Sequence, residues 1–100
     1  MIQVTFSFNN AVDYSKMINH LIAGIRKELF NNEKFRPNQE FGWKMSQAAV
    51  GMISILSSIT EMESPLHQVA SLGPDMWAWP GELIEFLKSA ETISSGIDPR

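Results

Sequence analysis

The chain has 100 residues, of which 44% are hydrophobic and 19% charged, and its formal net charge is −3. This length suits one domain with a hydrophobic core, and the lack of cysteine excludes a disulfide framework, a thiolate metal site and a cysteine nucleophile. The charge is uneven, because residues 1–44 carry six basic and four acidic side chains whereas residues 45–100 carry two and seven.

Residues 2–8, IQVTFSF, alternate between apolar and polar side chains, which is the period of a half-buried β-strand. A strand needs a neighbour for its backbone hydrogen bonds. We expect this strand to pair with its own copy across a homodimer, which would be two-fold symmetric. The alternatives are a segment of the same chain, such as EKFR, FRPNQEFGW or MWAW, or the edge of a different protein.

The next segment predicts an amphipathic helix over residues 11–30, because apolar side chains recur there at helical spacing. Gly24 lies inside this helix, where we expect it to allow another element to pack closely. Residues 31–42 read as a loop that contains Pro37. The aromatic residues Phe35, Phe41 and Trp43 in or beside it either hold the loop against the core or form a contact surface.

A second helix is predicted over residues 43–62, with one apolar face and an opposite side of small uncharged residues. Two interpretations fit this pattern: the helix is the central one of the monomer, or its small face meets another subunit. The second interpretation assigns seven residues to a dimer interface: Ile2, Val4, Phe6 and Phe8 on the strand, with Gly51, Ser54 and Ser58 on the helix.

Residues 65–72 predict a short helix, with Ser64 as its cap and Pro65 in its first turn. Pro80 predicts the start of a last helix, and residues 96–100 read as a frayed tail after a compact domain of residues 1–95. The predicted fold class is therefore mainly α (α+β): an N-terminal β-strand followed by three main helices and one short helix.

Catalytic and cofactor motifs are missing from the sequence. His20 and His67 are the only histidines, and neither belongs to a recognisable metal-ligand spacing. No G-x-S-x-G elbow, dinucleotide fingerprint or P-loop occurs. We therefore expect a protein that is not an enzyme and that has no catalytic residue, metal or cofactor.

The stretch GPDMWAWPGE carries two tryptophans two residues apart, so both rings point to one side if the chain is extended there. Either they close the core under the last helix or they form a contact surface, because Trp and Met are enriched at interface centres. The second interpretation predicts a partner-binding surface made of Asp75, Met76, Trp77, Trp79, Glu82 and Glu85. Its acidic residues would select another protein with a basic surface.

The function expected from these features is that of a small, non-enzymatic, homodimeric protein that binds or blocks another macromolecule through an acidic and aromatic surface. An inhibitor or immunity-type protein of a phage or mobile element is one form of it. No apolar stretch is long enough to span a membrane, so we expect a soluble cytoplasmic protein.

The alternative function is a nucleic-acid-associated regulator, although the acidic half of the chain would repel phosphate and makes nucleic acid the weaker choice of partner. Its basic and aromatic contact residues would be Arg26, Lys27, Lys34, Phe35, Arg36 and Lys44.

Overall fold

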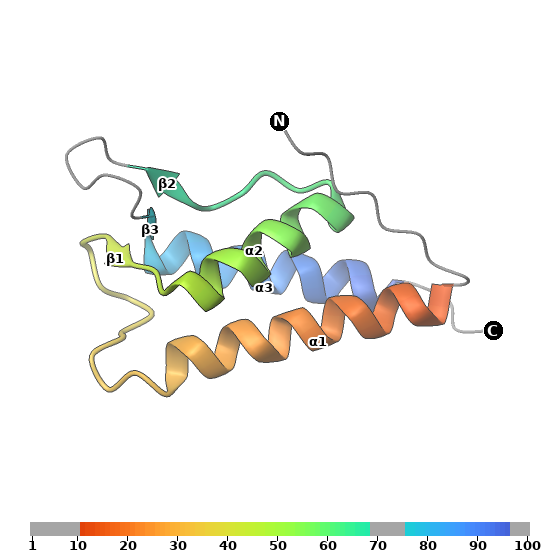
Figure 1. Cartoon of the computed structure of the whole chain (residues 1–100), viewed down its shortest axis with the longest axis horizontal. Helices are drawn as coiled ribbons and strands as arrows, with labels where there is room; N and C mark the ends of the chain where they lie inside the picture. The colour runs from red at the N-terminus through yellow and green to blue at the C-terminus, as the bar shows by residue number, and fades with distance from the viewer. Residues whose placement is uncertain (1–10, 69–75, 97–100) are drawn as a thin grey trace.

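The structure is a computed structural model that describes residues 11–68 and 76–96, and these form three helices and a small sheet (Figure 1). The helices are α1 (Ala11–Phe30), α2 (Gln47–Thr60) and α3 (Pro80–Ser95), which together hold 63% of the described residues. The strands are β1 (Trp43–Lys44), β2 (His67–Gln68) and β3 (Met76–Ala78).

The three strands form an antiparallel sheet in the order β1-β3-β2. Trp43 pairs with Ala78 on one side of β3, and His67 pairs with Trp77 on the other. The sheet lies at the end of the molecule where α1 ends and where α2 and α3 begin (Figure 1). The strand order brings residues 43–44, 67–68 and 76–78 together, although they are far apart in the sequence.

The helix predicted over residues 11–30 is confirmed as α1, which packs against both α2 and α3. Its apolar stripe enters the core because its members recur every three or four residues. Gly24 lies against Met52 of α2, and a Cβ built there would be 2.4 Å from the Met52 Sδ atom, which confirms the predicted close packing. The buried apolar residues of the core are Ile18, Leu21, Ile22, Ile25, Leu29, Phe35, Met45, Ala49, Ile53, Leu56, Ala78, Leu83, Phe86, Leu87 and Ala90.

Helix α2 is shorter than predicted, because it begins at Gln47 rather than at residue 43 and ends at Thr60. Ser46 is its N-cap, and the Ser46 Oγ atom accepts a hydrogen bond from the Ala49 N–H at 3.2 Å. The preceding Trp43–Lys44 segment pairs with β3, so it belongs to the sheet. At the other end Glu61 adopts the left-handed conformation, with φ of 57°, and terminates the helix.

The predicted fold class is wrong in its topology. The described residues contain no N-terminal strand and no fourth helix, and their sheet is built from residues 43–44, 67–68 and 76–78. The predicted strand at residues 2–8 lies outside the described residues. The segment MWAW, considered as a partner for it, does contain a strand, but β3 pairs with β1 and β2.

The short helix predicted over residues 65–72 is also wrong in the part that the structure describes. Pro65 and Leu66 belong to no helix, and His67–Gln68 is strand β2. Pairing with β3, together with packing of the His67 ring on Trp77, outweighs the local helix-start signal of Ser64 and Pro65. That signal is local, whereas the partner strand lies about ten residues further along the chain.

Polar contacts also join the helices. The Tyr14 hydroxyl of α1 donates to the Ile59 carbonyl of α2 at 2.7 Å. Buried Ser94 of α3 has its Oγ atom 2.7 Å from the Ser15 Oγ atom and 2.8 Å from the Asn19 Oδ1 atom, both on α1. These bonds fix how far α2 and α3 slide along α1. Among the residues described, no helix combines the length and the apolar character needed to cross a membrane.

Candidate partner-binding groove

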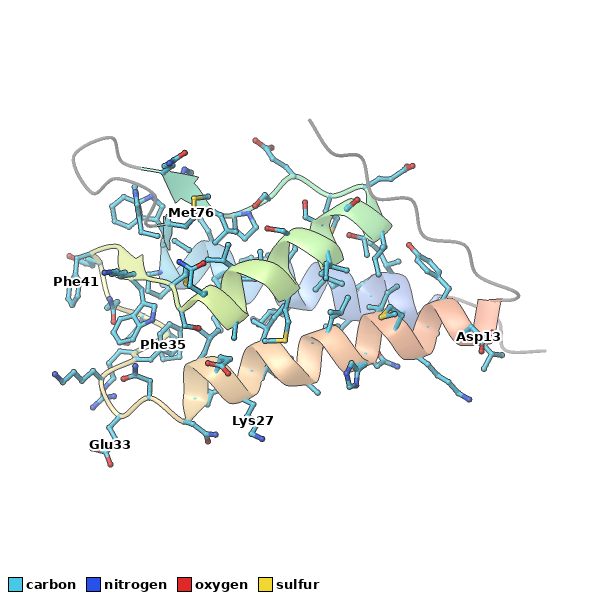
Figure 2. The ribbon with its side chains drawn as sticks, viewed as in Figure 1. Asp13, Lys27, Glu33, Phe35, Phe41 and Met76 are labelled. Atoms are coloured by element: carbon cyan, nitrogen blue, oxygen red, sulfur yellow. The ribbon has the colours of Figure 1, made fainter. Side chains whose placement is uncertain are left out.

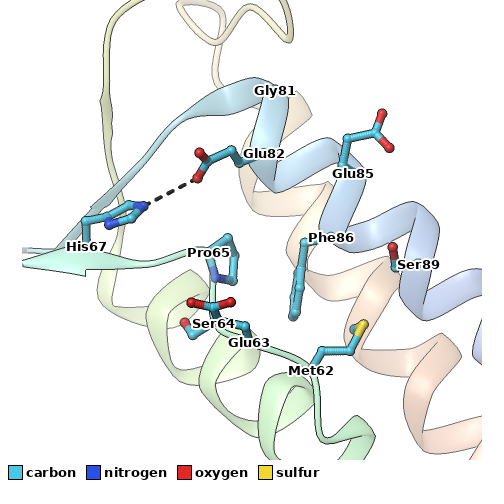
Figure 3. Close-up of a pocket in the computed structure, with 10 residues that line it drawn as sticks. All are labelled: Met62, Glu63, Ser64, Pro65, His67, Gly81, Glu82, Glu85, Phe86 and Ser89. Carbon is cyan, nitrogen blue, oxygen red and sulfur yellow. Dashed lines mark hydrogen bonds and ion pairs between the residues drawn. The ribbon is translucent and has the colours of Figure 1, made fainter.

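A groove of about 850 Å³ lies between the N-terminal half of α3 and the segment 62–67 that leads from α2 into β2 (Figure 3). We call it the α3 groove. It forms because Trp79 alone separates β3 from α3, whereas residues 62–66, which belong to no helix or strand, lead from the end of α2 to β2. Its lining residues are Met62, Glu63, Ser64, Pro65, His67, Gly81, Glu82, Glu85, Phe86 and Ser89.

The floor of the α3 groove is apolar. Phe86 is 7% exposed and Pro65 is buried, while Met62 is half-buried and packs against the hydrophobic core. In Figure 3 the Phe86 side chain comes from α3, and the Pro65 and Met62 side chains come from the opposite wall. An apolar floor of this kind favours burial of aliphatic groups from a ligand.

The rim of the groove is acidic. Glu82 and Glu85 stand on α3, Glu63 stands on the opposite wall, and none of the described residues that line the groove is a lysine or arginine. The Glu82 Oε2 atom lies 3.4 Å from the His67 Nε2 atom, a contact that joins the two walls at one end (Figure 3). The Glu85 Oε1 atom lies 3.6 Å from the Nζ atom of exposed Lys88. Glu63 has no hydrogen-bond or ion-pair partner among the described residues, so its carboxylate is available to a cation.

Aromatic side chains support the His67 wall. The His67 ring packs on the Trp77 ring with centroids 4.9 Å apart, and the Trp77 ring meets the Trp79 ring edge to face at 4.7 Å. Trp79 follows β3 with an extended backbone, so the two tryptophan rings lie on one side of the chain, as expected for residues two apart in an extended segment. Gly42 allows this packing, because a Cβ there would be 2.5 Å from the Trp77 Cε3 atom. Trp77 is half-buried, whereas Trp79 is 38% exposed.

The structure brings together part of the partner-binding surface predicted from the sequence. Glu82 and Glu85 line the groove, Met76 and Trp77 are half-buried in β3, and Asp75 lies outside the described residues. Sequence reasoning missed the other lining residues. Helical spacing could have found the α3 wall, because residues 82, 85, 86 and 89 recur at intervals of three and four. The opposite wall is close only through the tertiary fold, and it contributes Met62, Glu63, Ser64, Pro65 and His67.

The basic and aromatic residues assigned to a nucleic-acid surface differ in their exposure and in their contacts. Arg26 pairs with Glu91 of α3, and the Arg36 Nη1 atom donates to the Glu33 carbonyl at 2.6 Å and to the Phe35 carbonyl at 2.9 Å. The Phe35 ring is buried and cannot stack on a base. The remaining members of the set are the exposed Lys27, Lys34 and Lys44.

Of the other aromatic residues near the loop, Phe41 projects from the end of the molecule and is 66% exposed (Figure 2). Trp43 is partly buried and meets Phe35 edge to face, with ring centroids 5.4 Å apart. Phe35 and Trp43 thus hold the loop against the core, whereas Phe41 contributes to the surface.

The small residues assigned to a dimer interface lie on the exposed side of α2. Gly51, Ser54 and Ser58 are exposed, whereas Ala49, Ile53 and Leu56 on the other side are buried. Helix α2 is therefore not buried all round, and α1 is the helix that packs extensively on both others. The strand residues of the predicted interface, Ile2, Val4, Phe6 and Phe8, lie outside the described residues.

In the part of the chain that the structure describes, no three His, Asp or Glu side chains gather as a metal site would require. Comparison of the chain with protein-family models, with curated proteins and with solved structures finds no match. The groove must therefore be interpreted from its own geometry and charge.

Proposed function

We propose that this protein is a non-catalytic interaction protein that binds a cationic and partly apolar segment of another protein in the α3 groove. The observation that carries this proposal is the combination of three carboxylates on the rim, an apolar floor, and, among the described lining residues, no basic side chain except His67. The acidic balance of residues 45–100 adds to it, because a surface of one charge sign steers a partner of the opposite sign.

Lysine and arginine suit such a groove because each joins an aliphatic stem to a charged head. The stem would lie on the floor formed by Phe86 and Pro65, and the head would reach Glu63 or Glu85 on the rim. Each exposed ion pair contributes only about 0.2–1 kcal/mol. Burial of apolar side chains must therefore supply much of the affinity, at roughly 25 cal/mol per Å² of apolar surface removed from water.

The test uses a labelled twelve-residue peptide of alternating arginine and leucine, with fluorescence anisotropy as the readout of binding. A second peptide carries glutamate in place of arginine. The groove variant Glu63→Gln/Glu85→Gln removes two rim charges and leaves the His67–Glu82 contact in place. The matched control Glu33→Gln/Glu40→Gln changes the net charge equally at exposed positions of the loop, outside the groove.

We expect the parent chain to bind the arginine peptide and not the glutamate peptide. The groove variant should weaken binding by about 2- to 30-fold, which corresponds to the loss of two exposed ion pairs. The control variant should bind like the parent. Equal loss in both variants would contradict the proposal, because it would mean that net charge alone attracts the peptide. Equal binding of the two peptides would contradict it as well.

A further inference from the structure

Gly81 stands in the α3 wall of the groove, where the fold gives no reason for a glycine. A Cβ built at Gly81 meets nothing within 4 Å, and the residue belongs to the first turn of a regular helix. Gly24 and Gly42 differ, because a Cβ at either position would overlap a neighbouring side chain. Packing within the described chain therefore does not require a glycine at position 81.

The groove offers an explanation. The His67 Nε2 and Glu82 Oε2 atoms lie 3.4 Å apart and bridge the two walls at one end of the groove. A bound segment that is longer than the groove would leave it beside this bridge, over the rim. Gly81 precedes Glu82 on that rim and presents no side chain (Figure 3). A second polypeptide can therefore approach the α3 main chain closely at this position.

We propose that Gly81 is a specificity-determining residue of the α3 groove, and that the main chain of an extended partner segment crosses the first turn of α3 over it. This inference rests on the proposed function. Successive side chains of an extended segment point to opposite sides. With its main chain over Gly81, apolar residues on one side would face Phe86 and Pro65. Basic residues on the other side would remain near the rim carboxylates.

Gly51 supplies a matched control. It also lies in a helix, it is exposed, and a Cβ there also meets nothing within 4 Å. Because it belongs to α2 and does not line the groove, a side chain at Gly51 should not affect the bound segment. The pairs Gly81→Ala with Gly51→Ala, and Gly81→Leu with Gly51→Leu, therefore separate an effect on the groove from an effect on helix stability.

The experiment measures binding of the same alternating arginine–leucine peptide to the full chain and to these four variants. Gly81→Leu should lower the affinity at least about tenfold, because its side chain occupies the space of the bound segment. Gly81→Ala should cause a smaller loss, and both Gly51 variants should bind like the parent. Thermal unfolding of Gly81→Ala should occur at or above the parent temperature, which would exclude misfolding as the cause.

The outcomes separate this inference from the function on which it rests. If the Gly81 variants bind like the parent while Glu63→Gln/Glu85→Gln loses affinity, the groove function stands and the role of Gly81 is overturned. Equal losses at Gly81 and Gly51 would also overturn it. If the parent chain does not bind the arginine peptide, the proposed function and the role of Gly81 are both overturned.

Discussion

Replacement of Gly42 by alanine should destabilise the protein more than its small size suggests. A Cβ at this position would lie 2.5 Å from the Trp77 Cε3 atom, 2.9 Å from Cζ3 and 3.3 Å from Cδ2. The indole must therefore move by at least about half an ångström, and a packed interior resists such movement. Neighbouring rings restrict it further, because His67 lies at 4.9 Å and Trp79 at 4.7 Å from the same indole.

Overpacking of this kind costs about 1–3 kcal/mol. For a domain of this size, each kcal/mol lowers the melting temperature by roughly 4–8 °C, so Gly42→Ala should melt about 4–24 °C below the parent. Circular dichroism in the far ultraviolet measures the melting temperature. The near-ultraviolet spectrum reports the changed environment of the tryptophans.

Two other glycines serve as controls for this prediction. Gly24→Ala also creates a short contact, at 2.4 Å, but the contacted atom is Sδ near the end of the flexible Met52 side chain. We expect its effect to lie within about 1 kcal/mol of zero, because the gain in helix propensity offsets the displaced side chain. Gly51→Ala meets no neighbour and should stabilise by about 0.5–1 kcal/mol.

The expected order of stability is Gly51→Ala above the parent, Gly24→Ala near the parent, and Gly42→Ala well below it. A Gly42→Ala variant that melts at or above the parent temperature would refute the reasoning. It would mean that the loop before β1 does not pack on the Trp77 indole.

Two further predictions concern the contact between α1 and the end of α2. Burial, and secondarily the negative charge of Glu61, raises the pKa of Tyr14 above its usual value of 10.0. Because Tyr14 is the only tyrosine, phenolate absorbance should titrate at higher pH in the native than in the denatured protein. The free energy of unfolding should fall as the pH rises above about 10, since only the folded chain retains the phenol proton, and Tyr14→Phe should abolish that fall. Coincident native and denatured titrations would contradict the burial of Tyr14. Glu61→Gly should stabilise by about 0.5–1 kcal/mol in urea denaturation, because glycine adopts the left-handed conformation without strain, and an unchanged urea midpoint would count against it.

The sequence by itself determined the elements whose causes are local. The apolar spacing from Tyr14 to Leu29 defines α1, because a 3.6-residue period needs no information from elsewhere in the chain. Pro80 marks the start of α3, because its restricted φ suits the first helical position. Glu82 and Glu85 could also be assigned to one surface from the sequence, because residues three apart in a helix share a face.

Only the tertiary structure decided the sheet and the groove. Ser64 and Pro65 are typical residues for the start of a helix, yet His67–Gln68 pairs with β3 and the His67 ring packs on Trp77. The spacing of nearby residues cannot reveal this partner strand. Likewise Glu63 and Glu82 line one groove although 19 positions separate them in the sequence. Their proximity depends on where α2 ends and how β3 leads into α3. Contacts between distant segments arise from burial of the whole core, so no short stretch of sequence encodes them.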